Sequence, residues 1–396
     1  MKKISILYPF IGGPTVGGSH ISALKMIAEL DREKYDPKIV LHHTDGELGT
    51  YIHSLGLDYE VLPDIEIMAP KYSRTERNVS VLGYAFKTYG AIKAVLRRLD
   101  PDIVHTNDGR MHSNWVIPTK MSGRKFIWHN REGPSGTGVN KLAPLFADRI
   151  LSVSYFSKPQ KPIKSVDKIF SVIRSPFEFT KTVPDKAAAH SMIAKELNLP
   201  ENSIFVGYFG GLNDRKRPLN FVRAVKEIQA EIPGRPVHGL LFGKVILPQS
   251  KLDERAMALA ADLGIAEQVH LMGYRSPIEE YMAGVDALLI TAVNEPFGRT
   301  LIEAMYLRTP VIATRHGGNP EAITDGETGF LVKPESPEAF AKPMADLMRD
   351  PTLLNRITEA AHNDAANNYG LKRTVDAVSK VYDELAGVSA PQGVSA

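Results

Sequence analysis

Two glutamates, Glu295 and Glu303, stand eight residues apart around a predicted junction between a loop and a helix. Glu295 precedes a proline, which favours extended backbone, and the residues after the loop have helical spacing. We therefore expect Glu295 in a loop at the carboxyl end of a short strand and Glu303 near the first turn of the next helix. The free N–H groups around Phe297, Gly298 and Arg299 would then meet an anion such as a diphosphate.

A pair of carboxylates can also serve as the acid and the nucleophile of a glycosidase. If both residues were helical, they would lie roughly 12 Å apart at about 1.5 Å per residue, beyond the roughly 5 to 9.5 Å that such pairs need. Two separate binding roles are therefore expected. The alternative is a solvated loop residue at Glu295 and a helix-dipole partner at Glu303, and the surrounding residues favour the binding roles.

The composition is that of a soluble globular protein. Its 396 residues favour two domains, and 43% of them are apolar and 23% charged. Because no cysteine occurs, disulfides, thiolate metal sites and a cysteine nucleophile are excluded. The basic N-terminus has a short apolar run broken by Pro9, so we expect a first strand there and no export signal. No apolar stretch approaches the roughly 18 residues of a transmembrane helix, and a cytoplasmic protein is expected.

The overall charge of +3 conceals an asymmetry. Residues 1–180 carry 25 Lys+Arg against 18 Asp+Glu, and the remainder carries 23 against 27. Much of the basic excess lies in Lys71–Arg98, where apolar residues stand between the cations. A basic amphipathic helix there would rest on the anionic inner face of the cell membrane, as a peripheral protein does, or grip an anionic acceptor. A solvated helix packed on its own domain is the alternative.

Strand-like runs alternate with helical patterns along the whole chain. The first series of runs is Ile4–Tyr8, Lys38–His42, Ile103–Thr106, Lys125–Trp128, Ile150–Val153 and Phe170–Ile173, and the second is Ile204–Tyr208, Gly239–Phe242, Val269–Met272, Ala287–Thr291 and Val311–Thr314. Helical patterns such as Ser19–Leu30, Leu219–Glu231 and Asp253–Leu263 fall between them. The alternation predicts an α/β fold with two doubly wound, Rossmann-like domains, and a ligand in the cleft between them at the carboxyl ends of the strands.

The polar, proline-containing stretch 175–189 is the predicted linker. It separates an N-terminal domain (residues 1–178) from a C-terminal domain (residues 190–370). Residues 371–386 are expected to form a C-terminal helix, and one option for it is a return to the N-terminal domain. The tail 387–396 repeats Gly-Val-Ser-Ala and is expected to be disordered.

The glycine-rich turn after the first strand is a weak nucleotide signal. Its glycines, including Gly17 and Gly18, would let backbone N–H groups approach a ligand, with Ser19 as the helix N-cap. The turn lacks the Gly-x-Gly-x-x-Gly spacing of a dinucleotide site, and no acidic residue closes the second strand. A Gly-x-x-x-x-Gly-Lys-Ser/Thr phosphate loop is also absent, so nicotinamide enzymes and ATPases lose support.

The first strand of the second domain runs into a turn that suits a diphosphate. Gly210 and Gly211 stand at the strand end, and the cations Arg215 and Lys216 follow just ahead of Pro218, the expected first residue of a helix. A solvated basic turn is the alternative. Further glycine turns follow later strands of the same domain.

From Phe205 to Val332 the chain resembles the retaining, nucleotide-sugar-dependent glycosyltransferases of family 4, which have the two-domain GT-B fold. The shared features are the Glu-x7-Glu element Glu295 to Glu303, Gly273-Tyr274, a Thr-Pro-Val-Ile-Ala strand, the turn Gly317-Gly318 with Glu321, and the Thr-Gly-Phe-Leu-Val run ending at Val332. The N-terminal half matches more loosely, through Gly17-Gly18, Asp102-Ile-Val-His105 and His129.

This resemblance implies that the N-terminal domain (residues 1–178) binds the acceptor and that the C-terminal domain (residues 190–370) binds the nucleotide sugar. It also implies roles for individual residues. Glu303 would accept hydrogen bonds from the ribose, Lys216 would hold the diphosphate, and Glu295 with the backbone of the following loop would hold the donor sugar. His129 would approach that sugar from the first domain, although a histidine after a strand is more often structural. The implied catalytic set is Glu295, His129 and Lys216, and the donor-binding set is Gly17, Gly18, Gly211, Arg215, Lys216, Tyr274, Arg275, Ser276, Phe297, Gly298, Arg299, Thr300 and Glu303.

Two positions depart from the family pattern. Gly211 stands where an arginine is usual, and Arg215 is the nearby cation that would replace its charge. Arg308 stands where a glycine is common. The first departure bears on how tightly a diphosphate would bind.

The expected reaction moves a sugar from a UDP or GDP type donor to an acceptor hydroxyl, with retention as the resemblance implies. No Asp-x-Asp and no histidine cluster with metal spacing occurs, so a reaction without metal or cofactor is predicted, with Lys216 and fixed N–H groups stabilising the growing phosphate charge. The acceptor would be a carbohydrate or a lipid-linked molecule in polysaccharide or glycolipid assembly, and no nucleic acid. The alternatives are a nucleotide-sugar epimerase, a disaccharide phosphorylase and a non-catalytic nucleotide-sugar-binding protein.

Overall fold

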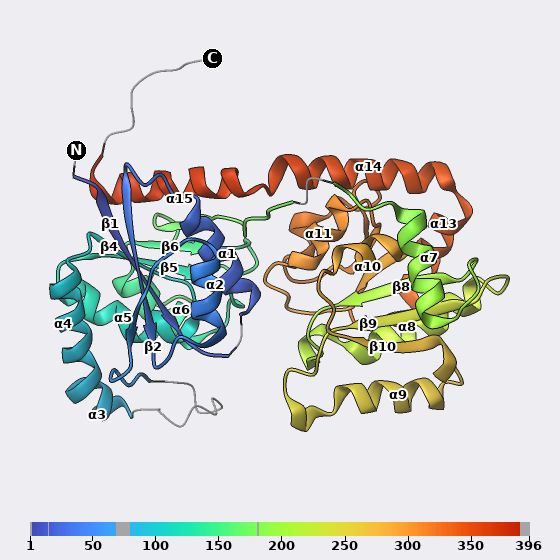
Figure 1. Ribbon diagram of the computed structural model, residues 1–396, viewed down its shortest axis with the longest axis horizontal. Helices are drawn as coiled ribbons and strands as arrows, with labels where there is room; N and C mark the ends of the chain where they lie inside the picture. Colours follow the sequence, from blue (N-terminus) through green and yellow to red (C-terminus); the bar gives the residue numbers. More distant parts are fainter. Residues whose placement is uncertain (1, 15, 69–79, 180–181, 389–396) are drawn as a thin grey trace, which may run out of the picture. The chain divides into compact units, whose positions relative to one another are not determined.

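The computed structural model describes residues 2–14, 16–68, 80–179 and 182–388. The chain forms two compact units (Figure 1). Unit 1 comprises residues 1–177 and 371–396, and unit 2 comprises residues 178–370. The C-terminal helix α15 (Leu371–Ala386) therefore belongs to unit 1, although unit 2 precedes it in the sequence.

A parallel sheet forms the centre of unit 1. Within the described ranges it has seven strands in the order β3-β2-β1-β4-β5-β6-β7. The strands are β1 (Ile4–Ile11), β2 (Tyr35–His42), β3 (Glu60–Leu62), β4 (Ile103–Thr106), β5 (Lys125–Asn130), β6 (Arg149–Ser152) and β7 (Phe170–Val172). Because the strand order reverses between β1 and β4, this sheet is doubly wound.

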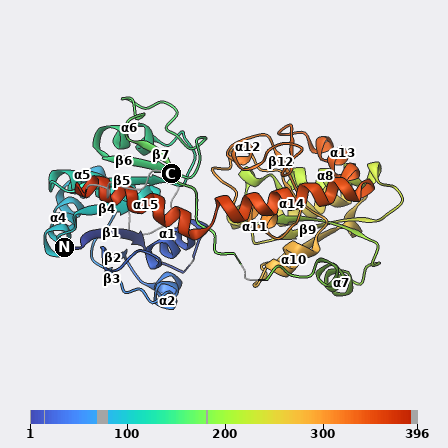
Figure 2. The same ribbon diagram turned by 90° about the horizontal axis from the view of Figure 1, so that it is seen from above.

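Helices cover both faces of this sheet. They are α1 (Gly18–Ala28), α2 (Gly46–Ser54), α3 (Val81–Gly83), the π-helix η1 (Tyr84–Thr88), α4 (Tyr89–Leu99), α5 (Gly109–Met121) and α6 (Thr137–Phe146), together with α15. Successive strand residues point to opposite faces: Ile6 and Tyr8 join a core with α1 and α15, whereas Leu7 joins a core with α4, α5 and α6. Helix α15 lies along the upper side of unit 1 in Figure 1 and crosses over the sheet in Figure 2.

Unit 2 repeats this architecture. Its sheet is parallel and, over the residues that the structure describes, contains six strands in the order β10-β9-β8-β11-β12-β13. These are β8 (Ile204–Phe209), β9 (Val237–Phe242), β10 (Val269–Gly273), β11 (Ala287–Ile290), β12 (Val311–Thr314) and β13 (Phe330–Val332). The order reverses between the neighbouring strands β8 and β11, which makes the carboxyl ends of these two strands the expected ligand position.

The helices of unit 2 pack an apolar core on the sheet. The α-helices are α7 (Lys186–Leu197), α8 (Pro218–Glu231), α9 (Leu252–Asp262), α10 (Glu279–Gly284), α11 (Arg299–Tyr306), α12 (Asn319–Ala322), α13 (Ala341–Arg349) and α14 (Pro351–Asn368). The short 3-10 helices are η2 (Asp214–Lys216), η3 (Pro248–Ser250), η4 (Ala266–Gln268) and η5 (Pro337–Phe340). The core on one face joins strand residues such as Val206 and Leu289 to Phe221 and Val225 of α8.

The prediction of two doubly wound, Rossmann-like domains is confirmed. The strand-like runs of both series are strands, with ends that differ by a few residues. Strands β3 and β13 were not predicted; they have three residues each and lie at the edges of their sheets. Three residues are too few to show the alternation that identifies a strand.

Two local predictions are wrong. The last four residues of the expected linker, 186–189, are helical, because α7 begins at Lys186 and Asp185 caps it by accepting a hydrogen bond from Ala188 N at 2.7 Å. Helix α1 begins before Ser19, and its N-cap is Gly17, whose N–H donates to His20 Nδ1 at 3.3 Å. The tail from residue 389 onward lies outside the described residues.

The basic segment packs on unit 1 through one face only. Its cations Lys71, Arg74 and Arg77 lie outside the described residues, but residues 80–98 form α3, η1 and most of α4. Four apolar side chains of this part are buried against the unit, namely Tyr84, Ile92, Val95 and Leu96. Three others, Val81, Leu82 and Phe86, are at least 71% exposed. In the described part of the chain, no helix is both long and apolar enough to span a membrane.

Candidate functional site

The turn after β8 fixes the position of Lys216. Asn213 Oδ1 accepts a hydrogen bond from Lys216 N at 3.0 Å, and Arg217 takes a left-handed conformation with φ of 53° before Pro218 starts α8. The side chain of Lys216 turns back over Gly210, where an added Cβ would lie 2.3 Å from Nζ. Gly210, with φ of 136°, therefore leaves the space that the ammonium occupies.

The loop after β11 is bonded to this turn. Thr291 is 2% exposed, and its Oγ1 bonds to the carbonyl oxygens of Lys216 at 3.0 Å and Arg217 at 3.1 Å. Val293 N donates to the carbonyl of Arg215 at 2.9 Å. The two segments that follow β8 and β11 are thus joined at the point where the strand order reverses.

The glycine turn after β12 contacts the backbone of Glu295. Gly318 N donates to the carbonyl of Glu295 at 2.8 Å. A Cβ added at Gly317 would lie 2.5 Å from that same oxygen, and a Cβ added at Gly318 would lie 2.4 Å from the carbonyl oxygen of Pro296. Only glycines allow the two backbones to approach this closely, and the contact fixes where the Glu295 side chain starts.

The Glu295 carboxylate forms an ion pair with Arg215, with Oε2 2.5 Å from Nη1. The Glu295 side chain is 12% exposed, and the Arg215 side chain is 39% exposed. A carboxylate that is mostly buried and paired with a guanidinium is a fixed hydrogen-bond acceptor. It is poorly suited to attack a carbon atom, because the pairing lowers its reactivity.

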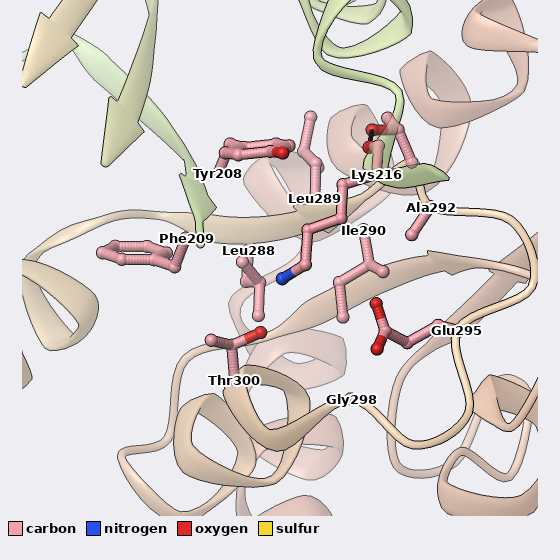
Figure 3. Close-up of a pocket in the computed structure, with 11 residues that line it drawn as sticks. Tyr208, Phe209, Lys216, Leu288, Leu289, Ile290, Ala292, Glu295, Gly298 and Thr300 are labelled. Carbon is pink, nitrogen blue, oxygen red and sulfur yellow. Dashed lines mark hydrogen bonds between the residues drawn. The ribbon is translucent and has the colours of Figure 1, made fainter. Parts of the chain in front are cut away.

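Lys216, Glu295 and Thr300 border one cavity that opens to solvent. The lining is completed by Tyr208, Phe209, Leu288, Leu289, Ile290, Thr291, Ala292 and Gly298. Figure 3 shows the Lys216 ammonium, the Glu295 carboxylate and the Thr300 hydroxyl directed into the same space above the start of α11. The cavity lies at the carboxyl ends of β8 and β11.

The ammonium of Lys216 has no direct counter-ion in the ranges that the structure describes. Burial lowers the pKa of Lys216 and the positive charge of Arg215 lowers it further, whereas the carboxylates of Glu295 and Glu303 raise it. A cation that is desolvated without being paired gains from the arrival of an anion. The cavity thus favours an anionic ligand at this end.

Helix α11 adds backbone donors and a carboxylate. Its N-cap is Gly298, which has no side chain, so no cap residue bonds the N–H groups of the first turn. Within the helix, Arg299 Nη2 lies 3.3 Å from Glu303 Oε1, an i,i+4 ion pair on a partly exposed surface. Such pairs contribute little, typically about 0.3 to 0.5 kcal/mol, so Glu303 remains available to hydroxyl groups of a ligand.

A larger residue at Gly211 would require the exposed side chain of Ile246 to move. An added Cβ there would lie 2.3 Å from Ile246 Cδ1, on the segment after β9 that pairs with Leu212. Arg215, the cation that the sequence analysis considered as a substitute, is engaged with Glu295. Lys244 lies on the same neighbouring segment, where its backbone carbonyl accepts a hydrogen bond from Leu212 N at 2.9 Å.

The residues expected near a nucleotide base follow β10. Tyr274 is 67% exposed, and Lys244 Nζ lies 5.7 Å from the centre of its ring. Ser276 is also exposed, whereas Arg275 pairs with Glu196 of α7 at 3.0 Å. Tyr274 and Ser276 are therefore accessible in this loop, and Arg275 is tied to a helix.

His129, Gly17 and Gly18 belong to unit 1, whereas the residues described above belong to unit 2. His129 is 1% exposed at the end of β5, and its Nδ1 lies 3.1 Å from His105 Nε2. Burial lowers the pKa of His129 well below its ordinary value, and the nearby Arg131 lowers it further, so the ring is neutral at neutral pH. Gly17 and Gly18 form the start of α1 at the carboxyl end of β1.

Several residues that shape the cavity were not among the predicted site residues. Gly210 makes room for Lys216, Thr291 joins the two loops, and Gly317 and Gly318 support Glu295. Phe297 was predicted for its backbone, and its side chain stacks on Tyr369 with ring centres 5.7 Å apart. The sequence carried a signal for the glycines, which follow strands, but none for the threonine.

The structure offers no arrangement typical of a metal centre among the residues it describes, since no three His, Asp or Glu side chains are grouped to hold an ion. The metal-independent and cofactor-independent reaction stays a prediction.

Residues 191–364 match the family model described as glycosyl transferases group 1. The D-inositol 3-phosphate glycosyltransferase of Corynebacterium efficiens is 30% identical over 227 residues, which cover 57% of this chain and 53% of that protein. The lipopolysaccharide core biosynthesis mannosyltransferase LpcC of Rhizobium leguminosarum bv. viciae is 24% identical over 352 residues, covering 82% and 97%. The chain spans about half the length of the D-inositol 3-phosphate glycosyltransferases that it matches.

Solved structures match nearly the whole chain. HepE of Anabaena in complex with UDP and glucose has a TM-score of 0.79 at 19% identity, covering 96% of this chain and all of HepE. The lipopolysaccharide outer core galactosyltransferase WaaB has a TM-score of 0.69 at 18% identity, covering 96% of this chain and all of WaaB. At such identities the matches establish the fold.

Most of unit 2 is covered by the family match, and both units by the structural matches. Residues 191–364 are therefore similar to glycosyl transferases of group 1, and the two Rossmann-like units of the chain match those of GT-B glycosyltransferases such as HepE.

Proposed function

We propose that the protein is a retaining glycosyltransferase that moves a sugar from a nucleoside-diphosphate sugar, of the UDP or GDP type, to an acceptor hydroxyl. The observation that carries this proposal is the convergence of Lys216, Glu295 and the start of α11 on one cavity at the ends of β8 and β11. The family of residues 191–364 and the fold of both units support it.

The charges of the cavity suit a diphosphate. Arg215 pairs with Glu295 and Arg299 with Glu303, which leaves Lys216 as the cation of this group whose charge is not directly compensated in the described part of the chain. The first N–H groups of α11 point to the same end and add partial positive charge. A diphosphate between Lys216 and α11 would be bound by charge-assisted hydrogen bonds.

The same groups would act in the reaction. When the bond between the sugar and the β-phosphate breaks, negative charge grows on the phosphate oxygens, and donors already in place stabilise that charge without reorganisation. Lys216 and the α11 N–H groups would supply this stabilisation. No side chain has to move for it, because Thr291 and Asn213 hold the turn that carries Lys216.

Glu295 would hold the donor sugar through its hydroxyl groups. Its ion pair with Arg215 and its backbone contact with Gly318 orient the carboxylate as an acceptor. We therefore assign it a positioning role and no covalent step. Retention, with the leaving phosphate receiving the acceptor's proton, rests on the family resemblance. Glu303 would accept hydrogen bonds from the ribose, and Tyr274 and Ser276 would lie near the base.

We propose a carbohydrate or lipid-linked acceptor from one relative and one exposed surface. The name of that relative refers to lipopolysaccharide core biosynthesis, whereas the name of another refers to D-inositol 3-phosphate, a small polyol phosphate. Val81, Leu82 and Phe86 form an exposed apolar patch next to Lys87. We propose that this patch rests on an anionic membrane surface, with its apolar side chains at the interface and its cations near the headgroups.

The donor proposal is tested by following release of the nucleoside diphosphate. A glycosyltransferase releases it only when an acceptor is present, whereas an epimerase does not release it at all and a disaccharide phosphorylase needs phosphate in place of a nucleotide. A thermal-shift screen over uridine, guanosine and adenosine diphosphate sugars first identifies the donor. If donors bind but no acceptor gives release, the protein is a binding module and the proposal fails.

Two substitutions test whether the nucleoside diphosphate is released by a reaction in this cavity. Lys216→Ala and Glu295→Ala should each lower kcat/KM at least about 100-fold, because each removes a fixed charge from the reacting region. Lys195→Ala and Glu227→Ala, at exposed helix positions of the same unit, are the matched controls and should keep the rate. Equal rates in all four variants would place the chemistry elsewhere.

Membrane association is tested separately by co-sedimentation with vesicles. Binding to vesicles that contain anionic lipid should fall when Val81, Leu82 and Phe86 are changed together to serine, and it should weaken with added salt. Ile163→Ser, at an apolar residue of unit 1 that is 55% exposed, is the control. Binding that is insensitive to these substitutions would contradict the proposed surface.

A further inference from the structure

The loop that leads from β6 to β7 (Figure 2) is rich in lysine. Residues 155–168 contain four lysines and one aspartate. Lys158 pairs with that aspartate, Asp167, at 2.6 Å, so the acid is already compensated inside the loop. The other three lysines are Lys161, Lys164 and Lys168. All three are exposed, and none has an acidic partner among the residues that the structure describes.

The neighbouring elements do not supply the missing negative charge. Helix α6 contains Lys141 and no aspartate or glutamate, and β7 contains no charged residue. The acid of the preceding loop 131–136 is Glu132, whose Oε1 would lie 3.3 Å from a Cβ added at Gly109, the first residue of α5. The electrostatic field around the three lysines is therefore positive.

Hydrogen bonds fix the first part of this loop near the carboxyl ends of the strands. Asn130, the residue after His129 on β5, donates from Nδ2 to the carbonyl of Ser157 at 2.9 Å. Further along, Lys161 N donates to the side-chain oxygen of Asn140, in the first turn of α6, at 2.7 Å. The loop thus leaves the carboxyl edge of the sheet close to His129.

The last part of the loop is fixed near the amino ends of the strands. Ile150 N, on β6, donates to the carbonyl of Ile169 at 2.7 Å, and β7, the edge strand of the described sheet, follows at once. Between the two sets of contacts the chain passes along β6, whose four residues span about 13 Å. The three unpaired lysines, Lys161, Lys164 and Lys168, are spread along this path, and we call them the lysine stripe.

The position of the stripe relates it to the proposed reaction. In open α/β sheets ligands bind outside the carboxyl ends of the strands, and His129 lies at such an end. An acceptor whose reacting hydroxyl lies at this edge would extend the rest of its chain along the stripe. Exposed ammonium groups bind phosphate and carboxylate groups as point charges.

We infer that the lysine stripe binds a negatively charged saccharide chain, carrying phosphate or carboxylate groups, whose reacting hydroxyl lies at the carboxyl edge of unit 1. This inference rests on the proposed function, because it names the class of the acceptor. A chain fits better than a compact anion, because the charges are spread over a distance of about 13 Å. The hydrogen bonds that fix the loop keep the entropic cost of binding low.

An anionic membrane is the other surface that lysines attract. Binding at a membrane interface also needs apolar side chains that enter it. Between residues 161 and 168 the one large apolar side chain that is strongly exposed is Ile163, at 55%, while Val166 is 2% exposed. The stripe therefore lacks the apolar half of a membrane anchor, in contrast to residues 81–86 of the same unit.

Calorimetry on the full-length protein tests the binding without any turnover. The probes are a hexamer of galacturonic acid, a hexamer of glycerol phosphate and neutral maltohexaose. At low salt at least one of the two anionic chains should bind at least about tenfold more tightly than maltohexaose, and added salt should weaken this binding. If neither anionic chain binds more tightly than maltohexaose, the inference is refuted.

Substitution of the stripe locates the binding. The triple variant Lys161→Gln, Lys164→Gln and Lys168→Gln should weaken binding of the anionic chain about tenfold, since exposed ion pairs contribute little singly but add together. The matched control is Lys3→Gln, Lys195→Gln and Lys380→Gln, which removes the same charge from exposed positions elsewhere and should keep the wild-type affinity. Equal weakening in both triple variants would show attraction to the overall charge only and would overturn the inference.

Vesicles of phosphatidylglycerol test the membrane as the other occupant of the stripe. The stripe variant and its control should co-sediment with these vesicles to the same extent, because residues 81–86 are the proposed membrane surface. If the stripe variant alone lost vesicle binding, the stripe would be a membrane surface and the inference would be wrong.

Kinetics separate this inference from the proposed function. With an anionic acceptor, the stripe variant should raise the KM for the acceptor about tenfold and leave both kcat and the KM for the donor unchanged. If anionic chains bind at the stripe but no acceptor gives release of the nucleoside diphosphate, the proposed function fails and the stripe stands. If a neutral acceptor gives release at the same KM in wild type and stripe variant, the proposed function stands and this inference fails.

Discussion

The ammonium of Lys216 occupies its position because Gly210 has no side chain. A Cβ at Gly210 would lie 2.3 Å from Nζ, and the φ of 136° at this residue is strained for any other amino acid. Gly210→Ala should therefore displace Lys216 and weaken binding of the nucleoside diphosphate at least about tenfold, with some loss of stability.

Calorimetric titration with the diphosphate, together with circular dichroism, measures both effects. Gly234→Ala is the control, because a Cβ there has no heavy atom within 4 Å. If Gly210→Ala binds the diphosphate as tightly as Gly234→Ala does, Lys216 is not a ligand of the diphosphate.

Asp108, at the N-cap of α5, makes the stability of unit 1 depend on pH. Its carboxylate accepts hydrogen bonds from Arg110 N and Met111 N, which lower its pKa. Burial, with a smaller contribution from the charge of Glu132, outweighs them and raises the pKa from 3.8 to about 6. A raised pKa means that its contribution to stability is present below pH 3.8 and is lost as the pH rises through about 6.

Asp108→Asn should therefore stabilise unit 1 above pH 7. Asparagine keeps the cap and carries no charge, so a gain of about 1 to 3 kcal/mol is expected at pH 8 and none at pH 4. Both tryptophans, Trp115 and Trp128, lie in unit 1, so denaturant unfolding followed by their fluorescence reports on this unit. Asp45→Asn is the control: backbone hydrogen bonds lower the pKa of Asp45, so this variant should show no gain at high pH.

The residue types of the site could be predicted from sequence, but their partners could not. Glu295, Lys216 and Glu303 were identified by their positions after strands and before a helix. The pairing of Arg215 with Glu295 depends on a side-chain direction that spacing does not determine. The same is true of the contact between Tyr382 and His105, which joins residues 277 positions apart in the sequence.

At the scale of elements, the site depends on the bond between the segments after β8 and β11. Thr291 makes this bond by donating to the carbonyls of Lys216 and Arg217. Thr291→Val keeps the shape but removes the donor, so we expect a loss of about 1 to 2 kcal/mol in stability and about tenfold in kcat/KM.

Thr309→Val distinguishes the two effects. Thr309 is equally buried in unit 2, and its Oγ1 donates to the carbonyl of Met282 at 2.7 Å, away from the cavity. Denaturation should show similar destabilisation in both variants, whereas activity assays should show a loss only in Thr291→Val. Equal activity would mean that the joined segments do not position Lys216.

The strands could be predicted because their residues are apolar in continuous runs, as burial on both faces requires. The exceptions have physical causes. β3 and β13 are edge strands of three residues, and α7 begins within a polar stretch because the Asp185 cap and not hydrophobicity sets its start. Where a single hydrogen bond decides an element boundary, composition does not show it.

At the scale of the whole molecule, the order of the elements along the sequence does not decide which unit they belong to. Residues 178–370 form unit 2, and α15 then contributes Val375, Val378, Val381 and Tyr382 to the core of unit 1. Polar side chains also join α15 to unit 1, because Asp383 pairs with Lys34 at 2.6 Å and accepts a hydrogen bond from Tyr35 OH at 2.8 Å. Helical spacing predicts the helix, but the sheet that it covers depends on contacts far along the chain.

Truncation after Gly370 should therefore destabilise unit 1, although most of its residues come from the N-terminal part of the chain. Removing α15 uncovers one face of the unit 1 sheet, so the tryptophan fluorescence of Trp115 and Trp128 should show loss of cooperative unfolding. Unit 2 keeps its own core and the cavity around Lys216, so the truncated protein should still bind the nucleoside diphosphate.

Truncation after Val388, which removes no residue of α15, is the control and should leave both the fluorescence transition and diphosphate binding unchanged. The two readouts come from different units, so they separate a local defect from general misfolding. If truncation after Gly370 abolished diphosphate binding as well, unit 2 would depend on α15, and the independence of the two cores would be refuted. If unit 1 unfolded as in the full chain, the core that α15 shares with β1 and β4 would contribute nothing measurable to its stability.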